Sequence, residues 1–335
     1  KADSAEITTL TVGNDADLEI TNALSITTGT VGGNATITAG DTTVNTLNVT
    51  GTLTAQLTSL TVETLLDVDG EATITVAEAL TAETIDVAEK ATIKANSAKI
   101  ETLTVGKDAN LEITNELSIT TGTVVGNATI AANRTEITTL KVGVDEEGVA
   151  GSNASITAGE TTVGTLEVTG NLTADVTTLK AETIDVDGKA TVEADSAEIT
   201  TLDVGADASL TIAGTLSITT GTVGGNATIT AGETTVNTVM VTGDLTAQLK
   251  SLTVEALLDV NGEATITVTD ALIAETIDVA DKATIKADSA EITNLTVGKD
   301  ADLEITNALS ITTGTVGGTV GGNANITAGE TTVDV

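Results

Sequence analysis

Apolar and polar residues alternate in short runs along the whole chain. In the stretch 91–108, ATIKANSAKIETLTVGKD, three such runs are separated by NS and ET and closed by GKD. Alternation with a period of two places the apolar side chains on one side of a β-strand, and the residues between the runs favour turns. The stretch therefore predicts three short strands, with their apolar side chains facing one interior.

The same pattern returns every 18 or 19 residues, except across one insertion between Val142 and Val168, and a valine ends the third run each time. A short fixed period with one set of strands per period indicates a solenoid. We therefore expect an all-β fold, a parallel β-helix (β-solenoid). Each turn of this helix, which we call a rung, would contain three short strands. About 18 rungs, stacked ~4.8 Å apart, would make a rod of roughly 85 Å. The marker valines are Val12, Val31, Val49, Val68, Val87, Val105, Val124, Val142, Val168, Val186, Val204, Val223, Val241, Val260, Val279, Val297 and Val316.

A longer period of five rungs is superimposed on the short one. The heptapeptide KADSAEI at Lys1 returns in similar form at Lys94, Glu193 and Lys286, which defines super-repeats 1–93, 94–192, 193–285 and a partial 286–335. We expect one continuous solenoid over 1–335, with a loop inserted at about 143–152 and a doubled Gly-rich unit at 314–323, because insertions cost least at corners. The alternation of 18 and 19 residues favours a right-handed helix over the left-handed hexapeptide type.

The amino-acid composition excludes some classes of binding partner. The chain has no Phe, Tyr, Trp, Pro, Cys or His, it has 73 Thr, and its formal net charge is −36. Thr and Val favour strands, and so acidic a surface repels nucleic acid and anionic membranes. No apolar run is long enough to span a membrane. The acidity has two interpretations: it keeps a β-rich protein from self-association, or it serves a cation-dependent surface.

Outward-facing residues at the same position in successive rungs form a column, and two such columns contain candidate functional residues. Thr occupies the position three before the marker valine in 14 of 17 rungs, and stacked hydroxyls can both donate and accept hydrogen bonds. The position directly before the valine is mixed but holds Glu167, Asp185 and Asp203 in successive rungs, with Asp187 just past the marker. Carboxylates stacked this closely repel one another, and calcium would remove the repulsion. These four residues are therefore a candidate calcium site, against the alternative that they spread into solvent.

Three other kinds of site fit the sequence poorly. β-Helical polysaccharide enzymes use clustered acids with basic and aromatic residues, whereas this chain has a single Arg, Arg134, and no His or aromatic residue. Ice-binding solenoids carry flat Thr arrays, but the Thr-x-Thr pairs here continue for at most two rungs. The Gly-Gly pairs precede strands rather than helices, so they indicate turns and not nucleotide sites. We expect a non-enzymatic protein without a cofactor, apart from calcium.

The repeat sequences can also be compared with those of known solenoid proteins. Rungs such as those around Asn226–Val239 and Val168–Ala174 resemble the repeats of filamentous-haemagglutinin-type adhesins and other large surface solenoids. The resemblance extends over the whole chain and implies a secreted or cell-surface rod used in attachment, sheath or fibre. It transfers no functional residues.

These observations predict an extracellular structural rod. Neither end of the sequence shows a capping helix, so we expect each end to pair with another copy or to continue in a longer chain. The first case gives a filament subunit that assembles end to end, and the second gives a stalk segment of a large adhesin. We also expect glycans where the source modifies Asn-x-Ser/Thr. These sites are Asn34, Asn48, Asn127, Asn133, Asn153, Asn171, Asn226, Asn294 and Asn325.

Overall fold

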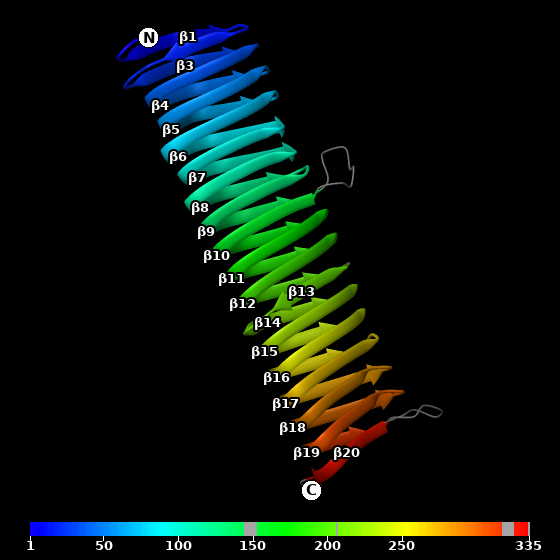
Figure 1. Cartoon of the computed structure of the whole chain (residues 1–335). Coiled ribbons are helices and arrows are strands. Elements are labelled where there is room, and N and C mark those ends of the chain that lie inside the picture. Colours follow the sequence, from blue (N-terminus) through cyan, green and yellow to red (C-terminus); the bar gives the residue numbers. More distant parts are fainter. Residues whose placement is uncertain (144–152, 206, 317–324, 334–335) are drawn as a thin grey trace. The chain divides into compact units, whose positions relative to one another are not determined.

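The computed structural model describes residues 1–143, 153–205, 207–316 and 325–333, which form strands joined by turns and contain no helix. The chain divides into two compact units, Lys1–Val176 and Thr177–Val335. In each unit, successive strands lie stacked on one another (Figure 1). The boundary falls within β11 (Asn171–Val186). The expectation of one continuous solenoid through both units stays a prediction.

Each unit contains a series of strands in chain order. The first unit contains β1 (Ala5–Val12), β2 (Ala16–Glu19), β3 (Leu24–Val31), β4 (Asn34–Val49), β5 (Thr52–Val68), β6 (Glu71–Glu89), β7 (Ala91–Lys107), β8 (Ala109–Val124), β9 (Ala128–Val142) and β10 (Asn153–Val168). The second contains β12 (Lys189–Val204), β13 (Ala208–Ile212), β14 (Leu216–Val223), β15 (Asn226–Val241), β16 (Asp244–Val260), β17 (Ala264–Asp281), β18 (Thr284–Lys299), β19 (Asp302–Val316) and β20 (Asn325–Val333).

Every strand pair within a unit is parallel, which confirms the parallel β-solenoid. In the first unit Val31 lies opposite Val12 on one side and Val49 on the other. The pairing continues past both insertions, since β9 pairs with β10 and β19 pairs with β20. The inserted residues 144–152 and 317–324 themselves lie outside the described residues.

The corners of a rung are visible in the burial pattern. In β4 the alternation of buried and exposed residues slips once after Ala39 and again after Val44, so one strand faces the interior from three sides. In β4 the three predicted strands are therefore one continuous strand that bends twice, whereas one rung is divided between β2 and β3 and another between β13 and β14. A β-bulge at a corner accommodates the extra residue of a 19-residue rung: β4 and β5 shift register between Val44 and Thr46. Such a bulge adds a residue to one strand without ending the pairing.

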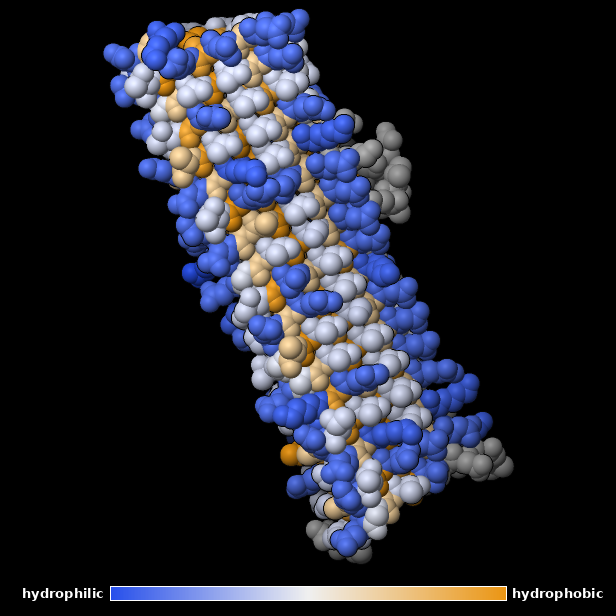
Figure 2. All heavy atoms as spheres, in the orientation of Figure 1, coloured by the Kyte–Doolittle hydropathy of each residue, from blue (hydrophilic) through white to orange (hydrophobic). Residues whose placement is uncertain are grey.

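The interior is a stack of aliphatic side chains. The marker valines from Val12 to Val297 are all buried, with at most 7% of their surface exposed. The threonine column also stacks as predicted, since Thr102 lies opposite Thr84 and Thr121. Figure 2 shows residues of intermediate hydropathy, the class that includes threonine, between hydrophilic residues on the visible face of each unit.

Candidate cation site and the pre-valine column

We call the residues directly before the marker valines the pre-valine column. Most of them are flanked by two interior residues and point outward: Leu66 and Val68 are fully buried, while Asp67 between them is partly exposed. The strand register stacks Asp67 opposite Asp86 in the first unit. Neighbouring rungs lie about 4.8 Å apart, so the column brings carboxylates close together, as predicted.

The predicted calcium ligands have separate surroundings. Glu167 belongs to the first unit, where Lys141 Nζ lies 2.8 Å from its Oε2. Asp185, Asp187 and Asp203 belong to the second unit, where Asp203 is exposed opposite Thr222. Because the placement of one unit against the other is not determined, a calcium site that includes all four residues stays a prediction.

Among residues 1–143, 153–205, 207–316 and 325–333, no group of three or more His, Cys, Asp or Glu is arranged to hold a metal ion. The same part of the chain contains no helix long and apolar enough to cross a membrane.

Two neighbouring carboxyl groups in the column, those of Asp67 and Asp86, have raised pKa values. Burial raises the pKa of Asp67, and the negative charges of Asp69 and Asp86 raise it further. Burial, followed by the charge of Asp69, also raises the pKa of Asp86. Asn48, one rung below, donates from Nδ2 to Asp67 Oδ2 at 3.3 Å, while its own Oδ1 is buried without a partner among the described residues. The protonated form of Asp67 is thus favoured by its surroundings.

The second unit contains a sequence copy of this corner, 192 residues further along. There Asp259 lies opposite Asp278, but Asn261 replaces the third aspartate and Met240 replaces the asparagine. Asn261 Nδ2 donates to Asp259 Oδ1 at 2.8 Å. One corner therefore places a negative charge beside the column, and its copy places a hydrogen-bond donor there.

Basic residues mostly connect neighbouring rungs. Lys94 Nζ lies 2.6 Å from Glu112 Oε2 and, by its hydrogen bond, lowers the pKa of that carboxyl. Lys286 contacts Glu304 in the same way at 2.7 Å. These partners face each other in the strand register. The side chains are about half exposed, so each pair adds at most about 1 kcal/mol, yet together they favour a single register.

Corner asparagines of the first unit form a short ladder. Asn153 Nδ2 donates to Asn127 Oδ1 at 2.9 Å, and Asn171 Nδ2 donates to Asn153 Oδ1 at 2.9 Å. All three belong to Asn-x-Ser/Thr sites and are exposed. Asn48 belongs to such a site as well, but it is only half exposed. Modification of these asparagines stays a prediction.

Sequence reasoning missed the ion pair of Glu167 and the effect of Asp69. The first could have been found by placing Lys141 one rung below Glu167, since both directly precede marker valines. The second depends on partial burial and on the conformation of the corner, which no residue pattern shows. No protein-family model, no curated protein and no solved structure matches this chain.

Proposed function

We propose that this chain is a structural, non-enzymatic element of an extracellular filament, in which copies assemble end to end. The observation that supports the proposal is the parallel register, which repeats within each unit from one rung to the next. Val31, Val49 and Val68, for example, stack one upon another in the first unit. Such a structure gains length with each rung and uses the same interactions at every step.

The contact between neighbouring rungs is also of the kind that builds open filaments. One edge of a rung meets the opposite edge of the next, so the contact is head-to-tail and does not close on itself. A rung of one copy placed on a rung of another would extend the ladder by strand addition. It would also bury interior apolar surface, at about 25 cal/mol per Å². The acidic sides, with a net charge of −36, would limit side-by-side clumping.

In the first rung, the interior surface is open on one side. Ile7 is half-buried, whereas Ile26, which lies opposite it in the next rung, is 3% exposed. In a filament subunit this surface would meet another copy. In a stalk segment, the second candidate, it would meet a preceding rung of the same polypeptide. The near-identical super-repeats suit either role.

A matched pair of variants tests assembly. Ile7→Lys places a charge on the open interior surface, whereas Thr9→Lys adds the same charge on the exposed outer face. We expect the natural chain and Thr9→Lys to form filaments in electron micrographs as concentration rises, and Ile7→Lys to remain dispersed. A natural chain that stays monomeric at high concentration would contradict end-to-end assembly. Denatured native material should migrate at the 33.3 kDa of this chain if it is a subunit, and far higher if it is a stalk segment.

A further inference from the structure

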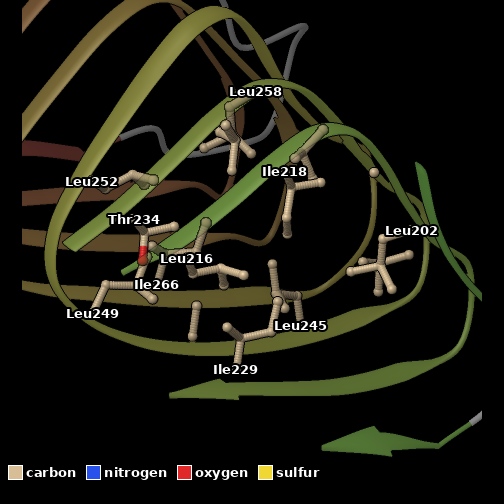
Figure 3. Close-up of a pocket in the computed structure, with 15 residues that line it drawn as sticks. Leu202, Leu216, Ile218, Ile229, Thr234, Leu245, Leu249, Leu252, Leu258 and Ile266 are labelled. Atoms are coloured by element: carbon tan, nitrogen blue, oxygen red, sulfur yellow. The ribbon is translucent and has the colours of Figure 1, made fainter. Parts of the chain in front are cut away.

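The interior of the second unit contains a cavity of about 50 Å³. Its walls come from β12, β14, β15, β16 and β17, and include Leu216, Ile218, Leu249 and Ile266. Figure 3 shows these side chains converging from neighbouring rungs. Interiors of this kind are normally packed with few voids larger than a water molecule, so a space of this size needs an explanation.

The explanation is one missing methylene group. An equivalent site in the first unit, 192 residues earlier, has a volume of about 20 Å³. Each of the fifteen lining residues of the larger cavity is identical at that offset except Val239, which corresponds to Leu47. In the first unit Leu47 Cδ1 lies 2.7 Å from the position that a Cβ on Gly29 would occupy. In the second, the shorter Val239 leaves the corresponding space beside Gly221 partly empty.

The chemistry of the walls determines what can occupy the cavity. Thr234 is the one lining residue with a polar side chain, and its hydroxyl oxygen is itself buried without a hydrogen-bond partner among the residues that the structure describes. A buried water needs about two to four polar partners, and one hydroxyl cannot supply them. Cavities with aliphatic walls stay dry and accept apolar guests instead. The walls here are leucine, isoleucine, valine, alanine and glycine apart from Thr234.

We propose that the second unit binds one small apolar molecule in this cavity, of the size of a xenon atom or a dissolved hydrocarbon gas. The site is preformed, because its walls belong to strands held by the parallel ladder. Binding therefore requires little rearrangement of the protein. The equivalent site in the first unit has less than half the volume and should not compete.

Xenon is the probe, and methyl NMR of the full chain under xenon pressure is the measurement. We expect saturable shifts at the methyl groups of Leu216 and Leu249 in the natural chain, with the equivalent Leu24 and Leu57 unaffected. Val239→Leu should weaken binding at least tenfold, and Leu47→Val should create a second site in the first unit. Neither change adds a polar group to the interior, so both variants should fold.

The reciprocal variants Val239→Leu and Leu47→Val allow the proposal to be refuted, and three results would do so. Equal xenon affinity in the natural chain and in Val239→Leu would overturn it, because the guest would then not occupy this cavity. Shifts of equal size around Leu24 and Leu216 in the natural chain would overturn it too, since the two sites differ only by the methylene of Leu47. Absence of saturable shifts at Leu216 and Leu249 up to high xenon pressure would also reject it.

Discussion

Exchange of the corner residue Asp69 for asparagine should stabilise the first unit near neutral pH. The change removes a negative charge beside Asp67 and recreates the arrangement of the second unit, where Asn261 donates to Asp259 at 2.8 Å. Two residues along a strand are separated by about 6–7 Å, so the lost repulsion is about 0.6 kcal/mol in water. An exposed hydrogen bond to a carboxylate adds a similar amount. We expect a gain of about 1 kcal/mol.

The gain should depend on pH with a definite sign. Because burial and like charges raise the folded-state pKa of Asp67 and Asp86, their contribution to stability is largest below the unfolded-state value near 3.9. It is lost as pH rises through the raised folded-state pKa values. Asp69→Asn removes one of the charges that raise these pKa values, so less stability is lost as pH rises. The free energy of unfolding of the variant should therefore exceed that of the natural chain by an increasing amount as pH rises above about 4. At pH 3 the difference between the two free energies should be small.

Urea titrations of both chains at pH 3, 5 and 7 would measure the effect. The matched control is Asn261→Asp, which introduces the charge at the equivalent corner of the second unit and should lower stability by about the same amount. Added salt should shrink both effects, since these groups are partly exposed. A free energy of unfolding for Asp69→Asn that equals the natural value at pH 7, or a gain of the same size at pH 3, would refute the reasoning.

Three further predictions concern packing and cations. Val239→Leu should stabilise the chain by about 1–1.5 kcal/mol in urea titrations, and Leu47→Val should destabilise it similarly. This follows from a cavity difference of about 30 Å³ at ~24 cal/mol per Å³, plus about 0.8 kcal/mol for one methylene. Gly29→Ala should cost about 1–3 kcal/mol, because its Cβ would meet Leu47 Cδ1 at 2.7 Å, whereas Gly221→Ala, facing Val239 and the cavity, should cost less. Calcium should raise the melting temperature and EDTA should lower it, and Glu167→Gln should reduce the response. If neither calcium nor EDTA changes the melting curve, screening by salt alone accounts for the reduced repulsion between these carboxylates.

The repeating part of the fold was predictable from sequence because its determinants are local. Period-two alternation fixes which side of a strand faces inward, and repetition at 18 or 19 residues fixes which residues stack. Val105 and Val124, for instance, are buried opposite each other as expected. The continuation of β4 through its corners was not predictable, because a turn-favouring residue such as Asn45 suggests a break, whereas the corner after Val44 is a one-residue slip after which the pairing resumes at Thr46.

The candidate site was less predictable than the fold. The stacking of Asp67 on Asp86 follows from the period alone, and the structure confirms it. Their raised pKa values depend on partial burial and on the position of Asp69, which are properties of packing. The cavity beside Val239 is similar: a valine and a leucine are equivalent in a pattern of apolar positions, and only the surrounding side chains make one methylene matter.

The repeated register also has a genetic consequence. Because residues 192 positions apart, such as Leu53 and Leu245, have the same role in their rungs, recombination between the copies would join two rungs that already fit. Deletion or duplication of the intervening segment would remove or add whole rungs and leave every remaining strand with a compatible neighbour. Alleles of this gene should therefore differ in length by whole five-rung or ten-rung blocks, and proteins of each length should fold equally well.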